Sequence, residues 1–170
     1  MEPVESFDFD AKFLKQHNIS NFSTFEELHK SNCRDIPDKC GVYIVFCPLS
    51  FKVQFKASTD GLEQYNSREL TVSIQALQDK WVPQTHILYI GKAGGTSNTL
   101  LKRVRQYVRY GYREVQNHRG GRYIWQLEGD KNLLIGYKVL INEDAKMYEE
   151  NMLTQFEEHF HKLPFANLKH

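Results

Sequence analysis

The chain has few of the features that mark disulfide-rich, zinc-stabilised or membrane-spanning proteins. Its only cysteines are Cys33, Cys40 and Cys47, an odd number at spacings that match no common zinc-binding pattern. Reduced structural thiols are therefore favoured over a set of zinc ligands. No apolar run approaches the length of a membrane span, and the acidic N-terminal segment lacks the basic and apolar regions of a secretory signal. We therefore expect a cytoplasmic protein with no membrane partner.

Low-complexity segments and internal repeats are also absent from the sequence. Hydrophobic residues make up 41% of the 170 residues, charged residues 25% and aromatic residues 13%, which lies within the range of globular proteins. A chain of this length can bury a hydrophobic core without disulfides or metal ions to stabilise it. The composition predicts one globular domain.

The charge of the chain is unevenly distributed. The net charge is only +1, yet the segment 92–122 holds eight Lys and Arg residues and one acidic residue. A basic segment on an otherwise acidic chain is typical of a contact with a polyanion. The alternative is a solvated basic helix face that binds no ligand.

The first forty residues favour helices. Apolar spacing indicates a helix over residues 9–17, and Ser23 with Glu26 forms a capping-box pattern that opens a second, short helix. We therefore expect an N-terminal helical extension over residues 1–40, followed by the main domain over residues 41–170.

The main domain begins with two strand-like runs of apolar, β-branched and aromatic residues, over residues 41–46 and 86–91. The residues between them are too numerous for a hairpin loop and too regular in pattern for a linker. We predict an insertion of mixed structure at about residues 48–85. It includes a strand or edge ribbon over residues 51–56 and a segment over residues 70–81 that fits either helix or strand.

The second half of the main domain combines helices and strands. Ser97 or Asn98 is placed to cap a basic helix that runs from Thr99 to about Tyr110. The later patterns predict two further strands and a final helix, over residues 123–127, 133–141 and 142–161.

The final helix carries a carboxylate on its apolar face. Glu149 shares this face with Met152 and Phe156, whereas Glu150 points toward the flank or the solvent. An inward carboxylate is unfavourable unless it is paired or coordinated. Glu149 is therefore either a metal ligand or a partner in a salt bridge.

Two basic residues are also placed where a cleft could form. Arg103 lies near the edge of the apolar stripe of its helix, and its guanidinium group suits two phosphate oxygens. A structural ion pair, for example with Glu149, is the alternative. Lys92 directly follows the second strand-like run, where it either binds phosphate at the rim of a cleft or is merely solvated.

Five motifs of this sequence together resemble the GIY-YIG nuclease family. They follow the order of the family's motifs and consist of Gly41–Tyr43, Tyr89–Ala93, Leu101–Tyr107, Glu149 and Pro164–Asn167. The segments 120–127 and 163–167 also look like those of a subgroup of small, single-domain bacterial members. The gap between the two tyrosine motifs is much longer here than the short gap typical of the family.

The resemblance implies an α+β fold, in which helices flank a small mixed or antiparallel sheet of three core strands. It also implies a hydrolase, a divalent-metal-dependent endonuclease acting on DNA. Tyr43 would be the general base, supported by a hydrogen bond from Tyr89. Arg103 would stabilise charge on the scissile phosphate, with Lys92 and Tyr107 as helpers.

The resemblance further implies a single metal ion, Mg²⁺ or Mn²⁺, bound by Glu149. Gly41 and Gly91 would support the site, the latter by letting the backbone approach closely, and Asn167 would tie the end of the fold to the site. A phenol with a pKa of about 10 is a poor base at neutral pH. A nearby cation, such as Lys92 or the metal, would therefore have to lower the pKa of Tyr43.

We expect no separate DNA-binding domain after the core motifs. We therefore expect DNA to be bound through phosphate contacts that weaken with salt, made by Lys102, Arg105, Arg109, Arg113, His118, Arg119 and Arg122. Two alternatives stay open. The chain could be a nucleic-acid-binding module with weak or no catalysis, or a restriction-type enzyme whose insertion recognises a short DNA sequence.

Overall fold

The computed structural model describes residues 4–57, 64–65, 68–69, 72–95, 97–114 and 121–168. Its helices are α1 (Val4–Gln16), α2 (Phe25–Lys30), α3 (Ile74–Lys80), α4 (Leu100–Gly111), α5 (Gly121–Ile124) and α6 (Ala145–Phe160), with a short 3-10 helix over Asp130–Asn132. Its strands are β1 (Ser20–Thr24), β2 (Gly41–Phe46), β3 (Gln64–Tyr65), β4 (Arg68–Glu69), β5 (Ile87–Ala93) and β6 (Leu134–Val139). None of these described helices combines the length and the apolar character needed to cross a membrane.

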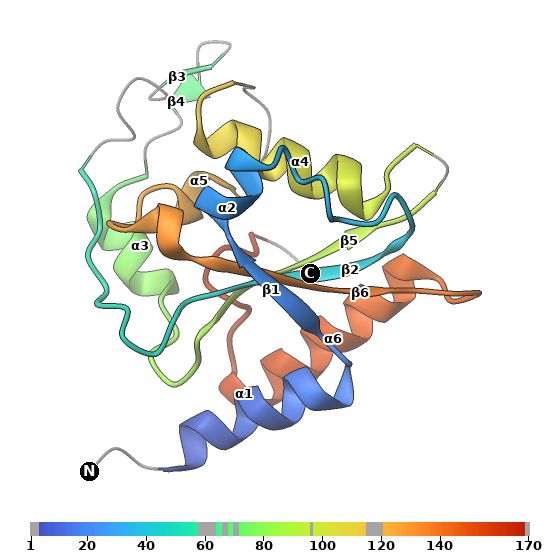
Figure 1. Ribbon diagram of the computed structural model, residues 1–170. Coiled ribbons are helices and arrows are strands. Elements are labelled where there is room, and N and C mark those ends of the chain that lie inside the picture. Colours follow the sequence, from blue (N-terminus) through green and yellow to red (C-terminus); the bar gives the residue numbers. More distant parts are fainter. Residues whose placement is uncertain are drawn as a thin grey trace.

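Within the described residues, four strands form one antiparallel sheet in the order β1-β6-β2-β5 (Figure 1). The fold is therefore α+β, as predicted, but the prediction of three core strands is wrong. The additional strand is β1, whose sequence is polar apart from Phe22 and therefore lacks the apolar pattern of a strand. The division of the chain at residue 40 stays a prediction, although β1 pairs directly with β6.

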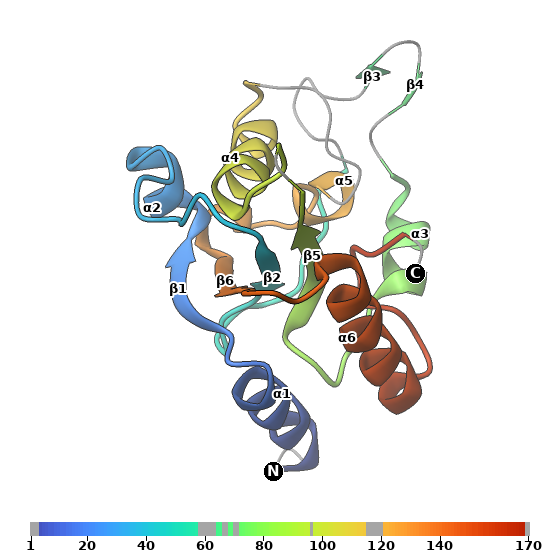
Figure 2. The same cartoon turned by 90° about the vertical axis from the view of Figure 1, so that its right-hand side faces the viewer.

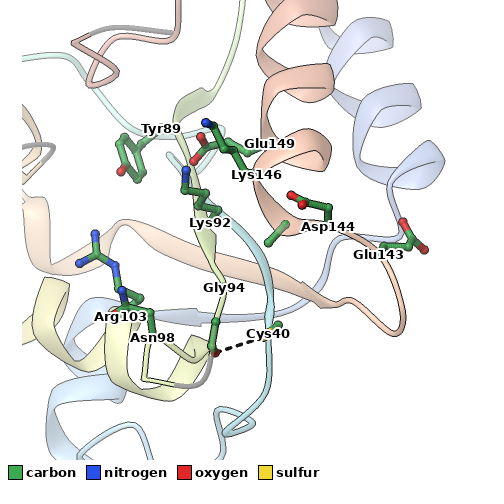
Figure 3. A pocket seen from close by; sticks show the side chains of 12 residues that line it. Cys40, Tyr89, Lys92, Gly94, Asn98, Arg103, Glu143, Asp144, Lys146 and Glu149 are labelled. Carbon is green, nitrogen blue, oxygen red and sulfur yellow. Dashed lines mark hydrogen bonds between the residues drawn. The ribbon is translucent and has the colours of Figure 1, made fainter.

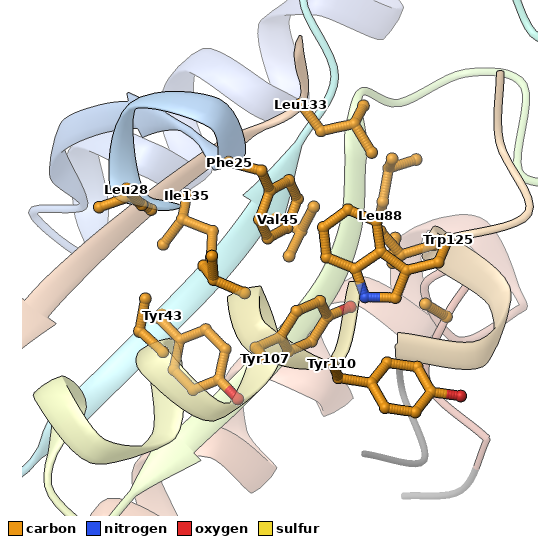
Figure 4. Packing of buried hydrophobic residues seen from close by; sticks show 14 of the residues in the cluster. Phe25, Leu28, Tyr43, Val45, Leu88, Tyr107, Tyr110, Trp125, Leu133 and Ile135 are labelled. Carbon is orange, nitrogen blue, oxygen red and sulfur yellow. The ribbon is translucent and has the colours of Figure 1, made fainter. Parts of the chain in front are cut away.

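Helices cover both faces of the sheet (Figure 2). α2, α4 and α5 pack on one face, and α1 and α6 pack on the other. Alternate residues of β2 therefore enter two different cores. Tyr43 and Val45 lie in the core beneath α2 and α4 (Figure 4), whereas Val42 and Ile44 pack toward α1 and α6. This arrangement explains why β2 is apolar throughout rather than alternating with polar residues.

The start of α2 is fixed by a capping box. The side chain of Thr24 accepts a hydrogen bond from the backbone N–H of Glu27 (3.1 Å), and the Glu27 carboxylate accepts one from the backbone N–H of Thr24 (2.9 Å). The predicted pair, Ser23 and Glu26, is therefore wrong by one residue. Ser23 lies instead in β1, where it pairs with Ile135 of β6.

Two other segments differ from their sequence patterns. Thr99 caps α4, rather than either residue of 97–98. The strand predicted over residues 123–127 is instead α5 followed by a turn, in which only Leu127 makes an isolated β-bridge, to Phe55. Packing of this segment into the core therefore outweighs the strand propensity of its aromatic and β-branched residues.

The insertion between β2 and β5 leaves the pairing of these two strands intact. Its described residues contain α3 and the β3–β4 ribbon. The segment 70–81, which fitted either helix or strand, contributes the helix α3. Of the strand or edge ribbon predicted over residues 51–56, only the isolated bridge at Phe55 is present, and the rest of the described backbone there is irregular.

The buried amide of Gln126 anchors this insertion to the core. Gln126 is 0% exposed, and its side chain donates to the carbonyl oxygens of Lys56 (3.0 Å) and Val72 (2.8 Å). The same side chain accepts a hydrogen bond from the backbone N–H of Val72 (2.6 Å). Lys56 also forms an ion pair of 2.9 Å with the buried Asp130. The insertion is therefore bound at two places, Lys56 and Val72, to the segment that precedes β6.

We expect Gln126→Ala to lower the free energy of unfolding by about 2–3 kcal/mol, because it removes a fully buried side chain and leaves partly buried backbone groups of Lys56 and Val72 without their partner. Urea denaturation followed by circular dichroism measures the change. The control is Gln78→Ala on the exposed side of α3, where we expect a change below about 0.5 kcal/mol. Equal stability of the two variants would contradict the anchoring role of the amide.

Candidate active site

A cleft of about 620 Å³ opens where the outer edge of the sheet meets the starts of α4 and α6 (Figure 3). Its wall combines residues from β5, from the loop that follows it, from α4 and from α6. The polar side chains of interest in this wall are Tyr89, Lys92, Asn98, Arg103, Lys146 and Glu149. In Figure 3, Tyr89, Lys92, Lys146 and Glu149 gather at one end of the cleft, and Asn98 and Arg103 lie at the other.

The position of β5 at the edge of the sheet explains how these side chains meet. Tyr89 packs on the face of the sheet that α4 covers. Lys92 points to the opposite face, because its partner across the β2–β5 ladder is Val42, which packs toward α6. Both faces of an edge strand therefore reach one cleft, between Arg103 of α4 and Glu149 of α6.

Besides burial, the charges of Glu149 and Arg103 shift the pKa of Tyr89, in opposite directions. Burial is the main cause that raises the pKa of Tyr89 above 10.0, and the negative charge of Glu149 adds to it. The contact with Tyr43 and the positive charge of Arg103 lower this pKa only in part. The charges of Arg103 and Glu149 therefore both act on Tyr89, whose neutral phenol is favoured.

Tyr43 lies directly beneath the cleft instead of in its wall. Its side chain is 0% exposed, and its hydroxyl group makes no close hydrogen bond within the described part of the chain. Burial and then the neighbouring Tyr89 raise the pKa of Tyr43 well above 10.0, which outweighs the lowering by Arg103. Within the protein itself the neutral phenol of Tyr43 is therefore favoured, and lowering of this pKa by Lys92 or a bound metal stays a prediction.

Gly91 makes room for the buried tyrosine. Gly91 and Tyr43 are partners across the β2–β5 ladder, and a Cβ atom built on Gly91 would lie 2.6 Å from Cζ and 2.8 Å from the hydroxyl oxygen of Tyr43. A side chain at position 91 would thus displace the phenol. Gly41 is equally constrained, because its Cβ would collide with the carbonyl oxygen of Lys138 and with the side chain of Leu100.

Tyr107, predicted as a catalytic helper, is also part of the core. It is fully buried, with its ring centroid 5.7 Å from that of Phe25 and 5.5 Å from that of Tyr89. Its position supports the Tyr89 ring from below. The structure therefore brings four of the six predicted catalytic residues to the cleft wall and places Tyr43 and Tyr107 beneath it.

Asn167 connects the C-terminal segment to the strand that carries Tyr89. Its buried side-chain amide accepts a hydrogen bond from the backbone N–H of Ile90 (3.0 Å) and donates one to the Ile90 carbonyl oxygen (2.9 Å). The backbone N–H of Ala166 donates to the carbonyl oxygen of Leu88 (2.8 Å). These contacts fix the backbone on either side of Tyr89.

The acidic side chains in the cleft wall are those of Glu143, Asp144 and Glu149. Of these, Glu149 lies at the end that also holds Tyr89 and Lys92 (Figure 3). Asp144, which also lines the cleft, caps α6 by accepting a hydrogen bond from the backbone N–H of Met147 (3.0 Å). No cluster of three or more potential ligands occurs among the described residues. Mg²⁺ usually keeps several water ligands and binds one or two carboxylates together with substrate phosphates. Glu149 in an open cleft, with no such cluster of ligands among the described residues, therefore fits Mg²⁺ or Mn²⁺ but not a closed structural zinc site.

The three cysteines are free in this structure. Burial raises the pKa of Cys33 to about 11 and that of Cys47 to about 12, so both stay protonated at neutral pH. Cys40 lies at the cleft and donates a hydrogen bond to the carbonyl oxygen of Gly95 (3.6 Å).

Those basic residues predicted to bind DNA that the structure describes do not line the cleft. Lys102 is exposed on α4. Arg105 donates to the carbonyl oxygen of Asn32 at 3.1 and 3.2 Å, and Arg109 forms an ion pair of 3.3 Å with Glu114. Two of these three side chains therefore have partners within the protein, which limits their availability for phosphate.

The other members of this basic set lie beyond α4. Arg113 is exposed and Arg122 is half-buried on α5, and neither contributes to the cleft wall. His118 and Arg119 lie outside the described residues. The positive charge at the cleft therefore comes from Lys92, Arg103 and one lysine that the sequence patterns did not identify.

This residue is Lys146. It lies in the first turn of α6, three residues before Glu149, so both share one face of the helix. Once Glu149 is assigned to the site, the residue three positions before it on the same helix face becomes a candidate as well. Asn98 was predicted only as a helix cap, and nothing in its sequence context indicated that it lines the cleft.

Known proteins provide no independent assignment of this site. The chain matched no protein-family description, no curated protein and no solved structure. A function can therefore be assigned only from the chemistry of the cleft and its position in the fold. The grouping of Tyr89, Lys92, Arg103 and Glu149 at the edge of β5 is the basis for that assignment.

Proposed function

We propose that the protein is a divalent-metal-dependent endonuclease that hydrolyses phosphodiester bonds in DNA. The observation that supports this function is the single cleft lined by Tyr89, Lys92, Arg103 and Glu149. These residues supply a phenol, two cations and a carboxylate from three separate elements. Such groups match the needs of phosphodiester hydrolysis, which are a proton acceptor, stabilisation of phosphate charge and a metal ligand.

Arg103 is suited to hold the scissile phosphate. Its Nη1 atom donates a hydrogen bond to the Gln106 side chain (3.0 Å), which restrains the guanidinium group on α4. The other donors of a guanidinium group can bind two phosphate oxygens at once. Lys92 approaches from β5 and adds a second positive charge, so the two cations stabilise the charge that develops on the phosphate.

Proton transfer is best assigned to Tyr89, with Tyr43 as a positioning residue. Tyr89 lines the cleft, whereas the Tyr43 hydroxyl is buried behind it. A water molecule in the cleft can therefore reach Tyr89 before Tyr43. This assignment exchanges the roles that the family resemblance implies for the two tyrosines, because access to the cleft differs between them.

Glu149 would hold Mg²⁺ or Mn²⁺ together with an oxygen of the bound phosphate. When bound, the ion would supply positive charge to the phosphate and to the leaving oxygen. Glu149 is held on the rigid first turns of α6, whose start is capped by Asp144. The carboxylate therefore faces the phosphate site without a change in the backbone.

A DNA-binding module with weak catalysis is the second candidate. It is favoured by the direction of the two pKa shifts, because burial disfavours the phenolate forms of both Tyr43 and Tyr89. A poor proton acceptor would leave phosphate binding intact while slowing hydrolysis. Binding of DNA without nicking in either Mg²⁺ or Mn²⁺ would support this candidate and contradict the endonuclease.

Nicking of supercoiled plasmid by the purified protein tests the proposed function. We expect nicking with Mg²⁺ or Mn²⁺ and none with EDTA, and we expect Arg103→Lys to slow it about 10²-fold, since the two-pronged phosphate contact is lost. Arg34→Lys, an exposed residue away from the cleft, is the control with unchanged activity. Discrete fragments in place of a smear would indicate a restriction-type enzyme.

A further inference from the structure

Lys146 is the second residue of α6 and lies two residues after the capping residue Asp144. The cleft wall around it also holds the carboxylates of Glu143, Asp144 and Glu149. The N-terminal end of a helix carries the positive end of the helix dipole, so the dipole itself does not favour a lysine there.

A structural ion pair does not account for this position. Lys146 precedes Glu149 by three residues, and a lysine on the N-terminal side of a glutamate is the less favourable orientation of such a pair. Within the described part of the chain, the Lys146 ammonium forms no ion pair. Its side chain is exposed and lines the cleft.

The geometry of the cleft places Lys146 across from Arg103. The two cations come from α6 and α4, on opposite faces of the sheet, with the edge of β5 between them. In Figure 3, Lys146 lies at the Glu149 end of the cleft and Arg103 lies at the Asn98 end. A nucleic-acid strand that runs between the two helices would therefore meet both cations.

We propose that Lys146 binds a DNA phosphate next to the scissile one, on the Glu149 side of the cleft, and thereby positions the strand. This proposal rests on the proposed function and adds a substrate-binding residue to it. Lysine binds phosphate as a point charge without a fixed geometry, which suits a backbone contact that is independent of base sequence. Arg103 holds the reacting phosphate, and Lys146 fixes the position of the DNA strand along the cleft.

Salt-dependent DNA binding tests the role of Lys146 separately from catalysis. Anisotropy of a short fluorescein-labelled duplex is measured in EDTA over a series of KCl concentrations. We expect Lys146→Gln to reduce the slope of log K against log salt by about 0.9, and affinity at 0.1 M salt by about tenfold. The substitution should leave the melting temperature nearly unchanged, since the Lys146 side chain is exposed.

Lys12→Gln is the matched control, because Lys12 is an exposed lysine that lines a different groove, between α1 and α6. It should leave the slope unchanged. A wild-type slope for Lys146→Gln, in a protein that binds and nicks DNA, would overturn the proposal for Lys146 alone. A wild-type protein that binds no DNA would overturn the proposed function and this proposal with it.

Discussion

Glu149→Gln is expected to slow metal-dependent nicking by about 10³-fold or more. Metal-ion catalysis contributes several kcal/mol to stabilisation of the transition state, and each 1.36 kcal/mol corresponds to a factor of ten in rate. Glutamine keeps the size of the side chain but removes the negative charge that a divalent cation needs. The loss is measured as the initial rate of plasmid nicking at saturating Mg²⁺.

Glu150→Gln is a closely matched control for this result. Glu150 is the next residue of α6, carries the same charge and is partly exposed, but it does not contribute to the cleft wall. It should retain nearly normal nicking. Calorimetric titration with Mn²⁺ in the presence of duplex DNA should show binding to Glu150→Gln and not to Glu149→Gln. Equal activity of the two variants would remove Glu149 from the metal site.

Tyr89→Phe is expected to slow nicking by about 10²–10⁴-fold, the usual contribution of a general acid–base group. Tyr43→Phe should cost only about tenfold, because its hydroxyl lies behind Tyr89 and does not line the cleft. It should also leave the stability unchanged or slightly higher, since it removes a buried hydroxyl that has no close partner in the described structure. A larger loss in Tyr43→Phe than in Tyr89→Phe would return the role of general base to Tyr43.

The pH dependence of nicking separates a proton acceptor from a packing residue. Burial raises the pKa of Tyr89 above 10.0, so the phenolate is a minor species at neutral pH. Below the pKa, the phenolate fraction increases tenfold for each pH unit. The wild-type rate should therefore rise with a slope near one in a plot of log rate against pH, from about pH 7 to 9. Tyr89→Phe should lose this slope, whereas a merely structural role would lower the rate equally at every pH.

Much of the sheet could be predicted from the sequence, because both faces of its central strand are buried. The continuous apolar run of β2 starts and ends where it was predicted, at Gly41–Phe46. The helical phase of Glu149 was likewise readable, since a spacing of three and seven residues from Met152 and Phe156 specifies one face of a helix. The basic helix α4 also occupies the predicted segment.

Features that depend on distant partners were not readable from local pattern. β1 has a polar sequence and exists as a strand because it pairs with β6. The depth of Tyr43 and Tyr107 depends on how closely α4 packs on the sheet, which residue types alone do not specify. Lys146 joined the site only because the start of α6 meets the edge of β5. In all three cases, contacts between distant parts of the chain determine the structure.

The amide of Asn167 has a consequence for how molecules of this protein behave toward one another. Backbone groups on the outer side of an edge strand can pair with a strand from another molecule and so begin aggregation. Asn167 occupies both backbone hydrogen-bonding groups of Ile90, and Ala166 occupies the carbonyl of Leu88. The C-terminal segment therefore shields β5 from intermolecular pairing while the side chains of Tyr89 and Lys92 stay accessible to a ligand.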